Sequence, residues 1–391
     1  MAISFEHTSN IIITCPKYIS PYLKKEVEKL DYNVEEQWVT GVSFKGTIND
    51  CINLNLNLRT GNQVLWLWKK IMAKNANELY DQCLKMPWED LLEVDGYLCI
   101  TSNVQNETID NNLYANVRLK DAIVDRFREK KGLRPDSGPN RNKTVIHLFW
   151  KGDDASIYID TTGETLSRHG YRKQPGLAPM QENLAAATIM ATRWDGNSSF
   201  INPMCGSGTL AIEAAMMALN RIPGLMRSNY GFMHINGYED TYYESLRREA
   251  RLKVKKNIDF KIIASDLDPV AVHAARSNAQ TAGVDLHIEF RQEDFRETLC
   301  PQEKKGVVMF NPEYGERLGE YEELEKIYKA IGDYLKNEAK GYFGYIFTAS
   351  PNLAKKVGLQ AERKIEFFNS KLECRLLEYE IYEGSRRSDK K

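Results

Sequence analysis

The stretch that decides the fold is residues 198–213, Ser-Ser-Phe-Ile-Asn-Pro-Met-Cys-Gly-Ser-Gly-Thr-Leu-Ala-Ile-Glu. An apolar strand runs into a glycine-rich loop, and a helix follows the loop. In such a turn the backbone N–H groups of the loop and of the helix N-terminus face a ligand that approaches the bare backbone closely. The stretch therefore predicts a ligand-binding turn at the end of a strand in an α/β sheet.

Several ligands suit such a turn. A phosphate-binding P-loop would need a lysine after its last glycine, but Thr209 follows Gly208 directly. The spacing Gly206-x-Gly208-x-x-Ala211 satisfies the loose dinucleotide pattern, yet the acid expected about 20 residues later is missing, because the next strand ends only at Asp266. Taken alone, the loop fits a dinucleotide and S-adenosylmethionine about equally well, and a plain tight turn is a third interpretation. The candidate ligand-binding residues here are Asn202, Pro203, Cys205, Gly206, Ser207, Gly208 and Thr209.

Two acids after the following strands favour an adenosyl ligand. Asp266 ends the second strand, where a carboxylate can accept both ribose hydroxyls. Asp294 follows the third strand and could accept a hydrogen bond from the adenine amine, although an ordinary loop acid is a close alternative. The residues after these acids, Leu267 and Phe295, are included in the predicted cofactor site. Asp268, before a proline, is instead expected to cap the next helix.

A second motif, Asn311-Pro312-Glu313-Tyr314, follows the buried strand 306–310. An Asn side-chain oxygen and a proline carbonyl are two acceptors suited to holding both hydrogens of an exocyclic amine, and Tyr314 can stack on an extruded base. As a dipeptide, Asn-Pro is more often a turn after a strand. Combined with the glycine loop upstream, the pattern favours Asn311, Pro312 and Tyr314 as catalytic residues that act by positioning.

Strand and helix signals alternate through the second half of the chain, which predicts a doubly wound, mostly parallel α/β sheet. The expected helices and strands are 180–194, 198–202, 208–219, 260–265, 269–281, 286–290, 306–310, 321–336 and 342–348, with an antiparallel hairpin at 364–368 and 372–382. The first half shows α+β patterns, with strands at 11–14, 42–46, 97–101, 144–150 and 156–160 and helices at 19–30 and 113–130. We predict domains at 1–61, 62–165 and 166–391.

Composition excludes several classes of protein. The chain is 42% hydrophobic and 27% charged, and no apolar run approaches the roughly 18 residues of a membrane span. The N-terminus lacks the pattern of a secretory signal, so we expect a cytoplasmic protein. Seven dispersed cysteines are typical of reduced thiols, and the six histidines show no metal-ligand spacing, so no metal site is expected.

Net charge is only −1, but the cations are clustered. Lys and Arg outnumber acids between Arg118 and Lys143, and a basic helix lies in the insert 221–256. Such clusters are either solvated helix faces or contacts to nucleic-acid phosphates. The apolar residues Leu113, Val117, Ala122, Val124 and Phe127 are expected to form the core face of the helix 113–130. The cations taken as candidate RNA contacts are Lys120, Arg126, Lys130, Lys131, Arg134 and Arg172.

Taken together, these motifs resemble the large-subunit ribosomal RNA guanine-N2-methyltransferases that carry a THUMP domain. The similarity covers nearly the whole chain and includes residues 117–125, 160–172, 178–185, 202–209, 311–318 and 368–376. It implies an N-terminal ferredoxin-like and THUMP region and a C-terminal Rossmann-like class I methyltransferase domain. It also implies S-adenosylmethionine as cofactor, with Pro179 near its methionine end, and large-subunit rRNA or its assembly precursor as partner.

The chain departs from this family at one position of the second motif. The family has Asn-Pro-Pro-Tyr, and Glu313 stands at the third position here. The motifs do not separate guanine N2 from adenine N6, or rRNA from another RNA such as tRNA, because each target presents an aromatic amine. A non-catalytic RNA-binding assembly factor, with the reaction spoiled by Glu313, is the alternative from another class, and a dehydrogenase is a distant third.

Overall fold

The fold was obtained as a computed structural model that describes residues 3–93, 96–174, 180–314 and 318–382. The chain forms two compact units that interleave along the sequence. The first comprises residues 1–15, 23–166 and 227–250, and the second comprises residues 16–22, 167–226 and 251–391. Each unit is described by itself below.

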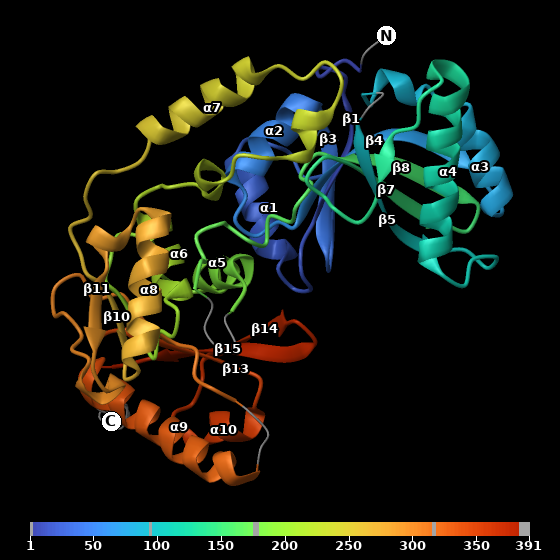
Figure 1. The fold of residues 1–391 in the computed structure, drawn as a ribbon. Coiled ribbons are helices and arrows are strands. Elements are labelled where there is room, and N and C mark those ends of the chain that lie inside the picture. The colour runs from blue at the N-terminus through green and yellow to red at the C-terminus, as the bar shows by residue number, and fades with distance from the viewer. Residues whose placement is uncertain (1–2, 94–95, 175–179, 315–317, 383–391) are drawn as a thin grey trace. The chain divides into compact units, whose positions relative to one another are not determined.

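The first unit is built on an eight-stranded sheet with the order β2-β3-β1-β4-β8-β7-β5-β6 (Figure 1). Its N-terminal elements are β1 (Ser9–Thr14), α1 (Ser20–Lys29), β2 (Glu36–Trp38), β3 (Gly41–Gly46), α2 (Ile48–Asn57) and β4 (Gln63–Met72). The elements that follow are α3 (Ala76–Leu84), β5 (Tyr97–Gln105), α4 (Asn112–Lys131), β6 (Asp136–Ser137), β7 (Thr144–Lys151) and β8 (Asp154–Asp160). Because β1 pairs with β4 and β4 pairs with β8, the segments predicted as separate domains at 1–61 and 62–165 share one sheet.

Helix α4 buries only part of the face that was expected to pack on the core: Ala122, Val124 and Phe127 are buried, but Leu113 and Val117 are not. Leu113 and Val117 are 64% and 41% exposed, so their assignment to the core was wrong. The buried residues are Ala115, Leu119, Ala122, Ile123, Val124 and Phe127. These recur every three or four residues, as a helix face requires. The prediction went wrong because the apolar residues of the first turns cover more than one face, and spacing alone does not tell which face the sheet contacts.

Part of the insert folds with the first unit. The turn Gly231–His234 accepts a hydrogen bond from the Thr144 hydroxyl at the His234 carbonyl (2.8 Å), and Phe232 N–H donates to the Thr161 carbonyl (2.9 Å). A Cβ at Gly231 would lie 2.2 Å from the Asp160 carbonyl oxygen, which explains why glycine stands there. The basic helix of the insert is α7 (Asp240–Leu252), and its contact with RNA stays a prediction.

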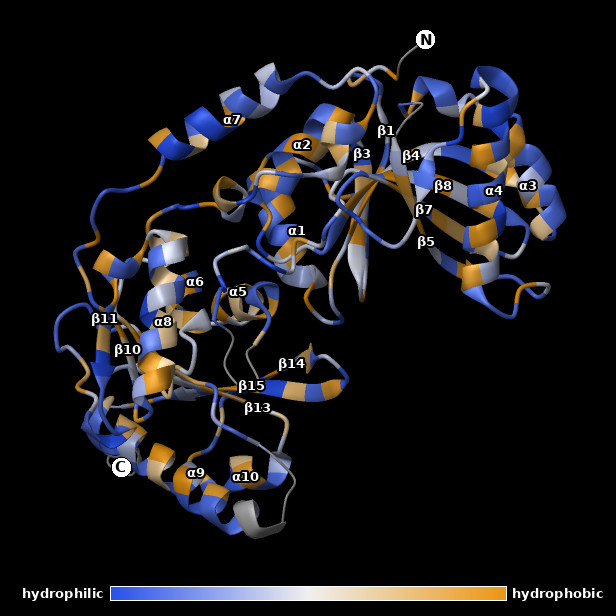
Figure 2. Ribbon diagram, viewed as in Figure 1, coloured by the Kyte–Doolittle hydropathy of each residue, from blue (hydrophilic) through white to orange (hydrophobic). Residues whose placement is uncertain are grey.

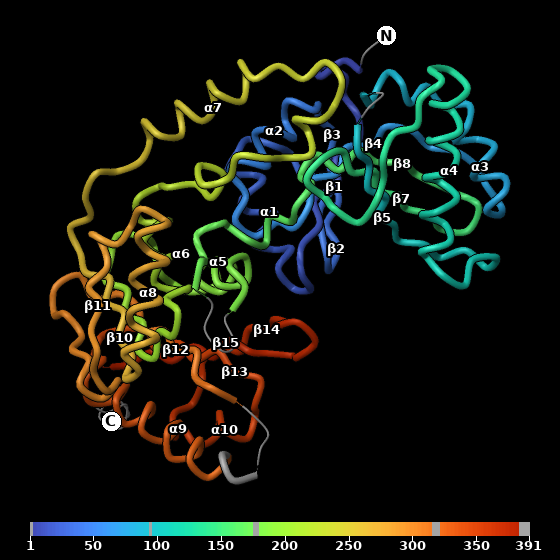
Figure 3. Tube along the Cα trace, in the orientation of Figure 1, coloured from blue at the N-terminus to red at the C-terminus, as the bar shows by residue number. Residues whose placement is uncertain are grey.

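The second unit is a seven-stranded sheet with the order β11-β10-β9-β12-β13-β15-β14, in which only the pairs made by β15 are antiparallel. Its strands are β9 (Phe200–Pro203), β10 (Ile262–Asp266), β11 (Glu289–Gln292), β12 (Val307–Phe310), β13 (Phe343–Thr348), β14 (Arg363–Asn369) and β15 (Leu372–Glu380). The predicted Rossmann-like fold with a C-terminal hairpin is confirmed, and Figure 3 shows β14 and β15 next to β13 at the end of the sheet. The strand expected at 286–290 is wrong in its first part, because residues 285–287 form a 3-10 turn.

Helices cover both faces of this sheet. Figure 1 shows α5 (Glu182–Ala191), α6 (Thr209–Ala218) and α8 (Pro269–Ala282) on one side, and α9 (Leu318–Glu338) and α10 (Pro351–Lys356) on the other. Apolar and polar residues alternate along α9 in Figure 2, as expected for a helix with one face on the core. Because β9, β10, β12 and β13 are parallel, their carboxyl ends meet at one edge, where ligands bind in open α/β sheets.

Candidate functional site

The glycine loop after β9 is held in an unusual backbone conformation. Met204, Gly206 and Gly208 have φ of +54°, +54° and +82°. A Cβ on Gly208 would lie 2.8 Å from the Cβ of Ala275 in α8, whereas a Cβ on Gly206 would meet nothing within 4 Å. Gly208 is therefore required by the packing of α8, and Gly206 leaves the backbone bare toward open space.

Asp266 fixes this loop from the end of β10. Its carboxylate accepts hydrogen bonds from the N–H of Gly206 (2.8 Å) and of Asp268 (3.0 Å). Leu267 beside it is 68% exposed. Asp268 accepts a hydrogen bond from Val270 N–H at the start of α8, so the predicted helix cap is confirmed. The end of β10 thus presents a half-buried carboxylate next to an apolar side chain that remains largely open to solvent.

Asp294 and Phe295 make more contacts within the protein than their predicted role in cofactor binding implied. Asp294 caps the short turn Phe295–Glu297 and pairs with Arg296 at 2.9 Å. Partial burial acts to raise the pKa of Asp294, but hydrogen bonds from the Arg296 backbone and side chain lower it below its usual value. Phe295 is buried, with its ring edge-on to those of Phe310 and Tyr334. The Phe295 side chain therefore belongs mainly to the core.

The other predicted loop residues hold the strands and helices together. The Asn202 amide donates to the Met309 carbonyl at 2.9 Å, which ties β9 to β12, while its own side-chain oxygen is buried and meets no partner in the residues that the structure describes. Pro203 ends β9, and the Ser207 carbonyl accepts a hydrogen bond from Asn278. Burial raises the pKa of Cys205, so its thiol stays protonated. Pro179 lies outside the described residues.

Arg172, expected to contact RNA, lies instead beside the cofactor loop. Its guanidinium donates to the Met180 carbonyl (2.5 Å) and to the Thr209 hydroxyl (2.9 Å), and lies 3.6 Å from the Glu182 carboxylate. The side chain is only 14% exposed. These contacts hold the Arg172 guanidinium at the start of α5 and α6. Its position therefore argues against an RNA contact and for a structural role.

Asn311 follows β12 at the same edge as the glycine loop. Its side-chain oxygen is buried and has no hydrogen-bond partner among the described residues. A buried acceptor without a partner is costly, so such a group usually awaits a ligand or an ordered water. The side chain of Glu313 is exposed, and its backbone carbonyl accepts a hydrogen bond from Tyr328 at 3.4 Å.

Tyr314 is held by the C-terminal hairpin. Its hydroxyl accepts a hydrogen bond from the Asn369 amide at 3.0 Å, and burial raises the pKa of Tyr314 to about 12. The sequence places Asn369 only in the turn of a hairpin. Spacing gives no sign that this turn reaches a residue so far upstream, so Asn369 is a site residue that sequence reasoning missed.

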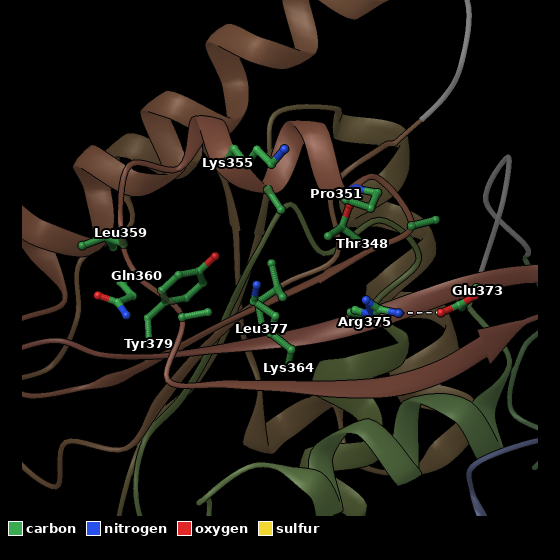
Figure 4. A pocket seen from close by; sticks show the side chains of 13 residues that line it. Thr348, Pro351, Lys355, Leu359, Gln360, Lys364, Glu373, Arg375, Leu377 and Tyr379 are labelled. Carbon is green, nitrogen blue, oxygen red and sulfur yellow. Dashed lines mark hydrogen bonds and ion pairs between the residues drawn. The ribbon is translucent and has the colours of Figure 1, made fainter.

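A cavity of about 600 Å³ lies elsewhere in this unit, between α10 and the hairpin. Figure 4 shows Lys355, Lys364 and Arg375 around it, with Arg375 paired to Glu373. None of the candidate residues of the glycine loop or of the Asn311 motif lines this cavity. The cavity is therefore lined by other residues than those predicted to carry the chemistry.

The candidate RNA contacts on α4 separate into two kinds. Arg126 donates two hydrogen bonds to Glu89 (3.1 and 2.6 Å) and is 16% exposed, and Lys120 pairs with Asp121 at 2.8 Å. In contrast, the side chains at the end of the helix and just beyond it are exposed, namely Lys130, Lys131 and Arg134. Only this second group presents its charge fully to solvent.

Arg126→Ala is expected to lower stability rather than RNA affinity. The ion pair lowers the pKa of Glu89 in the folded protein. Its contribution to the free energy of unfolding is therefore complete above the usual pKa of a Glu carboxyl, and it is lost as the pH falls through the lowered pKa of the folded state. We expect a loss of about 1 kcal/mol at pH 7 that shrinks below about pH 4. Urea unfolding at both pH values measures it. Lys131→Ala is the control, for which weaker RNA binding with unchanged stability is expected; the reverse pattern would contradict the assignment.

Neither a metal cluster nor a membrane helix is found among the residues that the structure describes. No group of three or more His, Cys, Asp or Glu side chains there could hold a metal ion. In the same ranges, no helix combines the length and apolarity needed to cross a bilayer.

The strand order, the glycine loop and the Asn311 motif define the chain as a Rossmann-like methyltransferase. Family models match three regions: an RlmL ferredoxin-like domain at residues 10–65, a THUMP domain at 73–160 and an RMKL-like methyltransferase domain at 169–378. The chain belongs to the RMKL-like methyltransferase family, and the resemblance seen in the sequence is confirmed at that level.

Individual relatives agree with this assignment. The ribosomal RNA large subunit methyltransferase K/L of Syntrophotalea carbinolica is 34% identical over 379 residues, which are 95% of this chain and 53% of that protein. This chain spans about half the length of the curated relatives it matches. Among solved structures, the protein SMU.472 in complex with SAH has a TM-score of 0.85 and 28% identity; the match covers 97% of this chain and 99% of the SMU.472 chain. A Listeria monocytogenes protein, described as a predicted N6-adenine-specific DNA methylase, has a TM-score of 0.85 and 27% identity over 96% of this chain and 97% of its own.

Proposed function

We propose that the chain transfers a methyl group from S-adenosylmethionine to the exocyclic N2 of a guanine in large-subunit rRNA. The observation that carries the proposal is the side-chain oxygen of Asn311, which is buried at the carboxyl edge of the sheet without a hydrogen-bond partner in the described part of the chain. An amine hydrogen of an extruded base would satisfy this acceptor. The relatives named as large-subunit rRNA methyltransferases support rRNA as the substrate.

The residues after β9 and β10 suit the adenosyl cofactor. The bare backbone at Gly206 admits close approach, the Asp266 carboxylate can accept from ribose hydroxyls, and the exposed Leu267 offers an apolar surface to adenine. A solved relative of the same fold is in complex with SAH, which supports the same ligand class here. S-adenosylmethionine supplies an electrophilic methyl group when it is bound.

The protein's part in the reaction is to position the base. The Asn311 oxygen and the Pro312 carbonyl accept the two amine hydrogens, which leaves the nitrogen lone pair directed at the donor. The Tyr314 ring, fixed through Asn369, offers a surface for stacking the base. No nucleophile is needed, and the protonated Cys205 does not act as one.

The first unit would hold the folded RNA. The match to a THUMP domain, together with exposed Lys130, Lys131 and Arg134, supports phosphate contacts at the end of α4. We place the protein in the cytoplasm, with large-subunit rRNA or its assembly precursor as partner.

Adenine N6 is the main alternative, and the description of the Listeria relative favours it. The decisive experiment incubates the purified full chain and labelled donor with separated rRNA and tRNA from cells lacking the gene. We expect N2-methylguanosine in large-subunit rRNA. N6-methyladenosine as the sole product would overturn the guanine assignment, and methylated tRNA alone would overturn the rRNA assignment.

The non-catalytic alternative rests on Glu313. Because the Glu313 side chain is exposed, it does not bind the Asn311 side-chain oxygen. We therefore expect the chain to catalyse methyl transfer. Donor binding without methylated product on any RNA would favour the assembly-factor interpretation instead.

Asp266→Ala tests the cofactor site. Loss of the carboxylate removes the acceptor for Gly206 N–H and for the proposed ribose contact, so we expect donor affinity to fall about 10- to 100-fold. Calorimetric titration measures it. Asp268→Ala is the matched control: it removes a helix cap at a cost of about 1 kcal/mol in stability, and donor affinity should stay near that of the wild type. Equal effects on affinity from both variants would place the ribose contact elsewhere.

A further inference from the structure

An aromatic surface with a lysine lies at the end of β14, outside the residues assigned above. The Tyr18 ring lies 5.8 Å from that of Phe368 (centroid to centroid), and the Lys17 ammonium sits 5.1 Å above the centre of the Phe368 ring. Tyr22 stacks on the neighbouring Phe367 at 5.7 Å. Residues 16–22 belong to the same compact unit as β14, which is the edge strand of its sheet. We call Lys17, Tyr18 and Phe368 the β14 platform.

The backbone at Tyr18 is unfavourable for the residue it carries. Ile19 N–H donates to the Pro16 carbonyl at 3.2 Å, so residues 16–19 form a tight turn, and Tyr18 has φ of +65°. Glycine or asparagine normally occupies such a position. Burial does not explain the tyrosine, because the residue is 37% exposed. A strained residue that keeps an exposed ring against Phe368 points to a use for that ring.

The platform includes the residue that precedes Asn369 at the end of β14. Phe368 precedes Asn369, whose amide holds the Tyr314 hydroxyl at 3.0 Å. Strands β13 and β14 both pair antiparallel with β15, so β14 ends at the same sheet edge as β13 and β12. Phe368, which the Tyr18 ring and the Lys17 ammonium contact, is therefore the chain neighbour of the residue that positions Tyr314.

We propose that the β14 platform binds the nucleotide next to the methylated base. This inference rests on the proposed function. Exposed aromatic rings stack on unpaired bases of any sequence, and a neighbouring cation pairs with the phosphate. Lys17 is exposed and close enough to the rings to serve that phosphate. The platform would keep the strand beside an extruded base from sliding out of the site.

The variants Tyr18→Gly and Lys17→Ala test the platform in the full chain. Glycine adopts positive φ freely, so Tyr18→Gly removes the ring without adding backbone strain. We expect its Kd for deproteinised large-subunit rRNA from cells lacking the gene, and its KM for that RNA, to rise about 10-fold, with kcat and donor Kd within about 2-fold of wild type. Lys17→Ala should reduce the slope of log affinity against log salt concentration by about 1.

Lys340→Ala is the matched control. Lys340 is an exposed lysine of the same unit, and it precedes β13 at the amino ends of the parallel strands, away from the carboxyl ends where the site lies. It should leave RNA affinity unchanged. Unchanged affinity in both platform variants would overturn the inference, as would a Tyr18→Gly variant that only lowers the melting temperature. A wild-type chain that methylates no RNA would instead refute the proposed function, so the two failures can be told apart.

Discussion

Turnover of the Asn311→Ala variant is expected to fall by about 100-fold or more, with donor affinity nearly intact. The side-chain oxygen is the buried acceptor proposed to hold the target amine, and loss of one positioned hydrogen-bonding group in an active site typically has an effect of this size. The fold should not suffer, because this oxygen makes no hydrogen bond within the described chain. Single-turnover methylation with saturating RNA and calorimetric titration of the donor measure the two quantities.

The control for this variant is Asn197→Ala, which removes an exposed amide from the loop before β9, at the opposite edge of the sheet. Its turnover should match that of the wild type. Asn311 would be structural rather than catalytic if Asn311→Ala lost donor binding or lowered the melting temperature in proportion to its loss of activity.

Gly208→Ala is expected to destabilise the protein by about 2 to 4 kcal/mol and to abolish tight donor binding. Two effects add. The residue has φ of +82°, which disfavours any side chain, and the new Cβ would lie 2.8 Å from that of Ala275. Either the loop or α8 must move, and the loop carries the proposed cofactor contacts. Urea unfolding and donor titration test both consequences.

Gly196→Ala separates these two effects. Gly196 has a similar φ of +78°, but a Cβ there would meet nothing within 4 Å. We expect Gly196→Ala to lower the free energy of unfolding only by the cost of a side chain at positive φ, about 1 to 2 kcal/mol, and to retain donor binding. If Gly208→Ala cost no more than this control, the close approach of α8 would not be what requires a glycine in the loop.

Much of the fold could be predicted because its local signals agree. The glycine loop, the acid at the end of β10 and the Asp268-capped α8 each follow from a short run of residues, and all indicate the same parallel sheet. The apolar face of α4 was predicted less well, because Leu113 and Val117 satisfy the helical period and yet lie outside the buried face. Periodicity gives a spacing, but the neighbouring sheet decides which face is buried.

By itself, the sequence determined the kind of protein and the motifs that meet at the sheet edge, since parallel strands bring whatever follows them to one side. Only the tertiary structure decided which polar groups have partners. Arg126 and Arg172 are bound to carboxylates or carbonyls, the Asn311 oxygen has no partner among the described residues, and Lys17 meets Phe368 from the other end of the chain. Such pairings depend on which groups the folded chain brings within hydrogen-bonding distance of one another. That distance cannot be read from the spacing of residues along the chain.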